Sequence, residues 1–236
     1  MGAVRAVGID VGTDAHHVVV VTGPGPAPHV TNAPAVSAAH VTVLDEPGAL
    51  EELEAVCAHA DAVGIDAPDQ QTDGCSLHGG GRGRCAEVAL AASAHGLATR
   101  LLGGPVGMLT PARQAPFPAR LGWMHTGFEL WRRLRAACPG VPLFEAYPSG
   151  SFRRLAAAAA PPVRLVPRGS RVAAVQRLAL LADQVELPPG AALWCLDGVD
   201  ALAAALAVYH VIVGAGSVVA EHDHPGHDGS RIVLMA

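Results

Sequence analysis

One five-residue sequence, AVGID, occurs twice in the chain, at Ala6–Asp10 and at Ala62–Asp66. In each copy an apolar run ends in an aspartate, and the residues that follow, VGT or AP, do not prolong a regular strand. Short apolar runs of this kind are typical of strands buried in a parallel sheet, whose neighbours lie about 4.8 Å apart. As parallel neighbours, the two strands would place both carboxylates at their carboxyl ends, where open α/β sheets bind ligands.

The rest of the chain alternates extended and helical patterns. Extended segments are expected at Val4–Asp10, His16–Thr22, His40–Asp45, Ala62–Asp66, Val141–Tyr147 and Arg231–Leu234. Helices are expected at Ala49–Ala60, Arg84–His95, Leu121–Ala137, Ser149–Ala160, Arg171–Glu186 and Val199–Val213. Three extended segments followed by alternating helices and strands predict an α/β fold with a mixed sheet, and we expect one domain over residues 1–236.

Composition excludes several classes of protein and of chemistry. Half of the 236 residues are hydrophobic, so the chain can bury a core and is not expected to be disordered. All 16 basic residues are arginine, which excludes Schiff-base, Walker-type and lysine-base catalysis. The five cysteines form no CxxC pair, and no segment reads as a signal peptide or membrane span. We therefore expect a soluble cytoplasmic protein without a membrane partner, and leave its oligomeric state open.

Charge is unevenly distributed along the sequence. Residues 82–177 contain 14 arginines and three acids, whereas the remainder holds two arginines and 18 acids. Such a split is consistent with a surface for an anionic partner, nucleic acid being the commonest. The alternative is that these sequence blocks intermix in the folded chain and leave no patch.

Two pairs of aspartates are candidate metal ligands. Asp10 and Asp66, brought together, would repel one another unless a cation lies between them or one is protonated, and oxygen ligands favour Mg²⁺ or Mn²⁺. Asp197 and Asp200 are three residues apart in LDGVDALAAAL, so on a helix they share a face. Glu145 ends another apolar run and would be a fifth acid. The structural alternatives are turn residues after strands for the first pair, and an N-cap at Asp197 with a dipole contact at Asp200.

Six segments occur in an order that resembles a known family: GIDVGT, IDAP, GRGRCAEV, an arginine-rich helix, EAYPS and LDGVDALAAAL. This set is similar to the domain-of-unknown-function family four-two-nine, bacterial and archaeal proteins predicted to be nucleases with a ribonuclease-H-like fold. The resemblance covers nearly the whole chain. It implies a mixed five-stranded sheet with its first three strands antiparallel and the first beside the fourth. It also implies that Asp10, Asp66, Asp197 and Asp200 bind metal, with Glu145 as a further ligand.

These observations predict a metal-dependent nuclease or phosphodiesterase that uses two-metal hydrolysis, with Mg or Mn as cofactor and Asp10 bridging both ions. The substrate would be nucleic acid or another phosphoester. Arg82, Arg84 and Arg113 are candidates for phosphate contacts, because guanidinium groups bind phosphate bidentately. Surface ion pairs are the alternative role for each of them.

Two other functions remain open. GIDVGT also resembles the first phosphate loop of the actin and sugar-kinase superfamily, which would make the chain an ATP-dependent phosphotransferase. That superfamily needs two lobes around a nucleotide, and 236 residues leave little room for the second. The other alternative is a catalytically inactive binding protein with the same fold.

Weaker metal-binding patterns involve histidine and cysteine. The tail holds three histidines at 222, 224 and 227, for which a solvated loop is the simpler interpretation. Cys75, His78 and Cys85 would make only a partial zinc site. His16 and His17 alternate along a strand, so at most one of them can face the acidic site.

Overall fold

The computed structural model describes residues 2–24, 37–44, 47–71, 86, 90, 113, 116, 119–170, 172–219 and 231–235. Within these residues the strands are β1 (Ala3–Val11), β2 (Ala15–Pro24), β3 (Ser37–Leu44), β4 (Ala62–Asp66), β5 (Leu143–Ala146), β6 (Ser217–Val219) and β7 (Ile232–Leu234). They form one sheet in the order β3-β2-β1-β4-β5-β7-β6. The strand β2 is antiparallel to β1 and β3, whereas β1, β4, β5 and β7 are parallel neighbours and β6 is antiparallel to β7.

The predicted α/β fold with a mixed sheet is therefore confirmed, but the predicted number of strands was too small. The described residues form seven strands instead of the five that the family resemblance implied, because β7, predicted as the extended segment Arg231–Leu234, pairs with β5, and β6 pairs with β7. The strand β6 was not predicted, and it is only three residues long. A run of three residues shows too little alternation to be assigned to a sheet from the sequence.

The helices are α1 (Pro47–Ala58), α4 (Gly122–Ala137), α5 (Pro148–Ala158), α6 (Ala173–Leu181) and α7 (Leu196–Ile212), with single 3-10 turns at Ala119–Leu121 and Ala191–Leu193. The helix α6 is shorter than predicted, and α7 begins three residues before the predicted Val199. Ala86 and Leu90 are helical, but the rest of the predicted helix Arg84–His95 lies outside the described residues. None of the described helices combines the length and apolar character needed to cross a bilayer.

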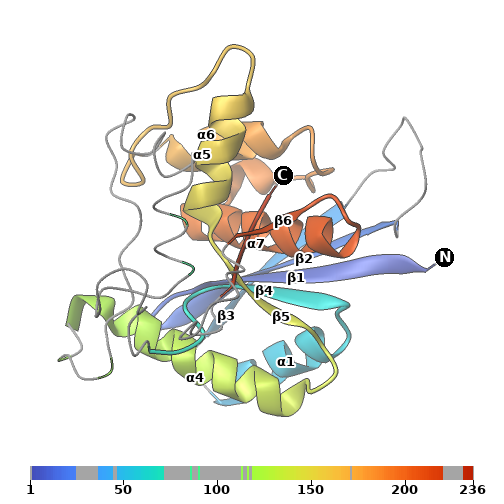
Figure 1. The fold of residues 1–236 in the computed structure, drawn as a ribbon, viewed down its shortest axis with the longest axis vertical. Coiled ribbons are helices and arrows are strands. Elements are labelled where there is room, and N and C mark those ends of the chain that lie inside the picture. The colour runs from blue at the N-terminus through green and yellow to red at the C-terminus, as the bar shows by residue number, and fades with distance from the viewer. Residues whose placement is uncertain are drawn as a thin grey trace, which may run out of the picture.

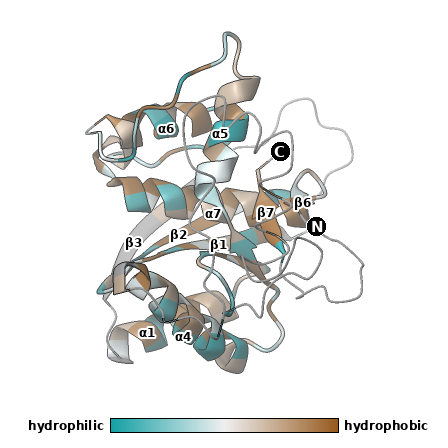
Figure 2. Cartoon of the chain, turned by 60° about the vertical axis from the view of Figure 1, so that its left-hand side comes forward, coloured by the Kyte–Doolittle hydropathy of each residue, from teal (hydrophilic) through white to brown (hydrophobic). Residues whose placement is uncertain are grey.

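The elements form three layers, with the sheet in the middle (Figure 1). The helices α5, α6 and α7 cover one face of the sheet, and α1 and α4 cover the other, as a second view also shows (Figure 2). Each face has its own apolar core, one built around α7 and one around α1 and α4. The helix α7 is buried from Gly198 to Tyr209, as expected of a helix that is apolar all round.

Two glycines allow α7 to approach the sheet closely. Gly8 of β1 and Gly64 of β4 are in register, and each is the central residue of one AVGID copy. A Cβ at Gly8 would overlap the carbonyl oxygen of Ala201, and a Cβ at Gly64 would lie 2.7 Å from that of Ala204. Only glycine permits a helix backbone this close to a strand. This contact brings the first turns of α7 to the ends of β1 and β4.

Arginines of the basic block pair with acids from outside it. Arg133 on α4 contacts Glu54 of α1 at 2.7 Å, and Arg135 contacts Asp69 at 3.0 Å. Arg135 also lies over the ring of Trp131, which is buried in the core. The charge blocks of the sequence therefore intermix on this side of the described structure.

Candidate metal centre

Three aspartates meet at the carboxyl ends of β1 and β4. Asp10 and Asp66 are paired in register, and Asp200 reaches them from the start of α7. One carboxylate oxygen from each lies within 4.8 Å of the others. We call Asp10, Asp66 and Asp200 the acidic cluster. Its position follows from the AVGID repeat, which ends both strands in aspartate, and from the two glycines, which bring α7 down to them.

Burial disfavours the ionised forms of the three carboxyl groups in the acidic cluster. Burial, followed by the charges of Asp200 and Asp197, raises the pKa of Asp10 to about 7. Burial and the neighbouring Asp10 and Asp200 raise the pKa of Asp66 well above its usual range. A hydrogen bond joins the carboxyl groups of Asp10 and Asp66, so the pair shares a proton when no cation is bound. Burial also raises the pKa of Asp200.

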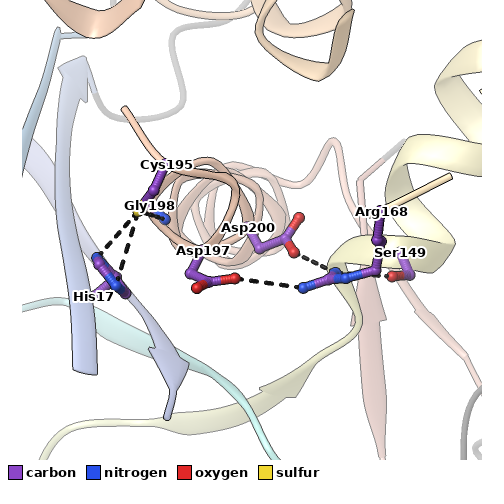
Figure 3. Close-up of polar contacts among 7 residues, drawn as sticks. All are labelled: His17, Ser149, Arg168, Cys195, Asp197, Gly198 and Asp200. Atoms are coloured by element: carbon purple, nitrogen blue, oxygen red, sulfur yellow. Dashed lines mark hydrogen bonds and ion pairs between the residues drawn. The ribbon is translucent and has the colours of Figure 1, made fainter. Parts of the chain in front are cut away.

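One arginine partly neutralises this charge. Arg168, in the segment between α5 and α6, forms an ion pair with Asp200 and lies 3.6 Å from Asp197 (Figure 3). Its guanidinium also donates to the hydroxyl of Ser149 at 3.3 Å. Burial lowers the pKa of Arg168, but the charges of Asp200, Asp66 and Asp10 outweigh this effect and raise it. Arg168 therefore contributes a positive charge at the place where the carboxylates converge.

The acidic cluster fits a hard divalent cation. Its donors are all carboxylate oxygens, the ligands that Mg²⁺ and Mn²⁺ prefer. Asp200 has no exposed surface, and its Oδ1 atom has no hydrogen-bond partner among the described residues. A buried carboxylate oxygen without a partner is costly, and a cation would satisfy it. Asp10, Asp66 and Asp200 are the residues that would hold such an ion.

The predicted N-cap at Asp197 was wrong, because α7 begins earlier. Cys195 is the N-cap, and its sulfur accepts a hydrogen bond from the backbone N–H of Gly198 at 3.4 Å. Asp197 lies in the first turn and belongs to a second group of donors with His17 and Cys195. We call His17, Cys195 and Asp197 the mixed cluster. Asp197 lies between the two clusters, with His17 and Cys195 on one side and Asp200 and Arg168 on the other (Figure 3).

Glu145 is buried but is not among the three carboxylates that converge. On β5, Phe144 packs against the core around α7, and Leu143 packs against the core around α1 and α4. Because side chains alternate along a strand, Glu145 shares the second face with Leu143 and with its register partner Ile65. Asp66, one residue beyond Ile65, points to the opposite face.

Most of the candidate arginines, cysteines and histidines from the sequence lie outside the described residues. Arg113 is exposed, whereas Arg82 and Arg84 lie outside the described residues. The same holds for Cys75, His78 and Cys85 and for the three tail histidines. The adjacent histidines point to different places, since His17 contacts Cys195 while His16 lines a cavity with Leu50, as the prediction that at most one of them faces the acidic site allows.

Sequence reasoning did not identify Arg168, His17 or Cys195 as members of a site. The register offered a signal for His17, which is directly opposite Asp10 on the neighbouring antiparallel strand. Cys195 precedes the LDGVD segment and could have been weighed as an N-cap. Nothing in the local sequence around Arg168 indicates its contact with Asp200, which depends on how the segment between α5 and α6 folds back over α7.

Comparison with known proteins adds little to this description. No family model matches the chain, and no curated protein matches it. Among solved structures, the chain is similar to Thermus thermophilus RuvC, with 16% identity, 91% of this chain and 98% of that chain covered, and a TM-score of 0.38. It is also similar to T. thermophilus RuvC in complex with a Holliday junction substrate, with 15% identity, the same coverage and a TM-score of 0.39. With scores this low, the description of the centre rests on the geometry of this chain.

Proposed function

We propose that this chain is a divalent-metal-dependent phosphodiesterase that acts on nucleic acid, and that the acidic cluster holds its cation. The observation that carries the proposal is the convergence of Asp10, Asp66 and Asp200 beneath the first turns of α7. Three buried carboxylates this close cannot all be ionised unless positive charge joins them. Arg168 supplies one positive charge, and a divalent cation would supply the remainder.

A divalent cation bound there would supply Lewis acidity, which activates water and stabilises the leaving oxygen of a phosphodiester. The role of the chain is to hold the carboxylates in place on rigid elements. Asp10 is our candidate for a ligand shared between two cations, because it ends the central strand β1 beside both Asp66 and Asp200. The two-metal form of the mechanism is part of the proposal.

Arginines would position the substrate. Arg168 is partly exposed beside the acidic cluster, so its guanidinium can reach a phosphate oxygen there. Arg82, Arg84 and Arg113 remain proposed phosphate contacts on the basis of the sequence. The ribonuclease-H-like family resemblance of the sequence motifs supports the same class of reaction and the same cofactors, Mg or Mn.

The test is calorimetric titration of Mg²⁺ and Mn²⁺ into the wild type and into Asp10→Asn, together with cleavage of labelled single-stranded, duplex and branched substrates. We expect the wild type to bind the cation and cleave at least one substrate, and Asp10→Asn to lose measurable binding and about a hundredfold or more in rate. Asp183→Asn, which makes the same chemical change at an exposed position, is the matched control and should behave as the wild type.

The other outcomes assign the alternatives. If the wild type binds no divalent cation, the proposal is wrong and the aspartates are structural. Cation-dependent turnover of ATP without phosphodiester cleavage would contradict the proposal and favour the phosphotransferase. Binding of the cation with neither reaction would contradict it in favour of a catalytically inactive binding protein.

A further inference from the structure

The mixed cluster brings together three different ligand types from two elements. Cys195 and Asp197 come from the start of α7, and His17 comes from β2. Their donor atoms lie within 4.8 Å of one another. The sulfur of Cys195 is 3.6 Å from Nδ1 and 3.8 Å from Nε2 of His17, and Figure 3 shows the imidazole facing the thiol.

The three donor atoms are close enough to bind one metal ion after a small rotation of the side chains. In a tetrahedral zinc site the metal lies about 2.3 Å from sulfur and about 2.0–2.1 Å from nitrogen, which places the two ligand atoms about 3.6 Å apart. The distance from Cys195 Sγ to His17 Nδ1 has this value, but Sγ lies nearly as close to Nε2, so the imidazole would have to turn until one nitrogen lone pair points at the ion.

The chemistry of the donors separates this cluster from its neighbour. Thiolate and imidazole ligands select zinc-class transition metals, whereas the carboxylates of Asp10, Asp66 and Asp200 select hard cations. The N–H of Gly198, which donates to Cys195, would orient the thiolate from outside the ligand shell. Cys195 is exposed and His17 and Asp197 are half-buried, so an ion can enter from solvent.

We propose that His17, Cys195 and Asp197 form a metal site of their own, which binds a zinc-class divalent cation and leaves one coordination position open to solvent. Three protein ligands with an open fourth position are the pattern of zinc sites that bind water or a substrate atom. The site adjoins the acidic cluster, since His17 is the register partner of Asp10 and Asp197 lies one helical turn from Asp200. The inference requires metal binding alone and does not rest on the proposed phosphodiesterase activity.

The test is titration of Co²⁺ into the whole metal-free chain, read by absorption. We expect one equivalent to produce a thiolate-to-cobalt charge-transfer band in the near ultraviolet together with the visible bands of a tetrahedral ion. Zn²⁺ should abolish these bands, and excess Mg²⁺ should leave them intact. Cys195→Ser should remove the charge-transfer band and weaken Zn²⁺ binding by about 100-fold or more, since loss of an outer-shell partner alone costs 10–100-fold. Serine is a good N-cap, so this variant keeps the start of α7.

Two controls keep the result interpretable. The double variant Cys75→Ser and Cys85→Ser removes the other predicted zinc ligands and should keep the band. Asp10→Asn should also keep it while losing Mg²⁺, so failure of this inference and failure of the proposed function can be told apart. Absence of the band in the wild type, or its persistence in Cys195→Ser, would overturn the inference.

Discussion

The two faces of the sheet are packed in different ways. On one face, α7 rests on β1 and β4 through Gly8 and Gly64, so that the helix backbone meets the strand backbone. On the other face, α1 and α4 pack through large side chains such as Leu53, Leu130 and Trp131. Gly127 of α4 also makes a close contact there, but with the side chain of Ala67.

The handling of charge differs in the same way. On the α7 face, Asp10 and Asp200 are buried beside the close backbone contact, and their pKa values are raised. On the α4 face, arginines and acids meet as partly or fully exposed pairs, such as Arg133 with Glu54. Close packing on the α7 face thus buries carboxyl groups whose ionised forms are disfavoured, and such groups are typical of ligand-binding sites. The face covered by α1 and α4 is held by the packing of large apolar side chains.

The largest expected effect is the pH dependence of stability without metal. The folded-state pKa of Asp10 is about 7, above its unfolded value of about 4, so the stabilisation from its bound proton is complete below pH 4 and is lost as the pH rises to about 7. The loss is at most about 4 kcal/mol for this group, because each pKa unit corresponds to about 1.4 kcal/mol.

Urea unfolding in the presence of a chelator, measured from pH 4 to pH 8, checks this prediction. The stability of Asp10→Asn should fall less steeply than that of the wild type, and Asp183→Asn should follow the wild type. Mn²⁺ should restore stability at pH 8, where it no longer competes with protons. Parallel profiles for the wild type and Asp10→Asn would show that Asp10 titrates normally.

The next largest effect is a loss of stability when the close contact between α7 and β1 is disturbed. Gly8→Ala should destabilise the protein by about 2–3 kcal/mol, because the new Cβ overlaps the backbone of Ala201 and pushes α7 from the sheet. The displaced Asp200 should also weaken Mn²⁺ binding.

Gly48→Ala is the matched control, since a Cβ there meets nothing within 4 Å and the residue lies in α1. This variant should be neutral or up to about 1 kcal/mol more stable. Chemical denaturation and calorimetry measure both quantities, and equal stability of the two variants would mean that the helix has room to adjust.

A smaller effect, on the affinity for Mn²⁺, is expected when Arg168 is replaced. Arg168→Gln removes a positive charge that competes with the cation for Asp200, so Mn²⁺ affinity should rise about threefold to tenfold at constant pH. Arg164→Gln makes the same change at an exposed position of the same segment and should leave the affinity unaltered. Unchanged or weaker binding in Arg168→Gln would show that the arginine does not oppose the cation.

The smallest effect is a loss of stability on the face of the sheet that α1 and α4 cover. Glu54→Gln breaks the ion pair with Arg133, whose side chains are 23% and 27% exposed, and should cost about 0.5–1 kcal/mol in low salt and less in high salt. Mn²⁺ binding should not change. Altered metal binding in this variant would mean that the two faces are coupled through the sheet.

Local sequence patterns were sufficient to predict β1 and β4 and to name all three converging acids as candidates, together with Asp197 and Glu145, which lie outside the acidic cluster. The range of β4 was predicted to the residue, and β1 to within one residue at each end. Both strands have apolar runs that end in aspartate, and such a pattern is a property of a few neighbouring residues. The extended pattern of Arg231–Leu234 likewise predicted β7, whereas the three-residue strand β6 was missed, and only its pairing with β7 makes it part of the sheet.

The membership of each cluster was decided by tertiary structure. Residues three apart on a helix point about 60° apart around its axis. With α7 held against the sheet, this angle directs Asp200 to Asp10 and Asp66 and directs Asp197 to His17 and Cys195. Likewise, Arg168 meets Asp200 only because the segment after α5 folds back over α7. The sequence by itself determined which residues end the strands and begin the helix, because those signals are local. Which of these side chains lie together depended on the crossing of helix and sheet, because that geometry joins residues more than 100 positions apart.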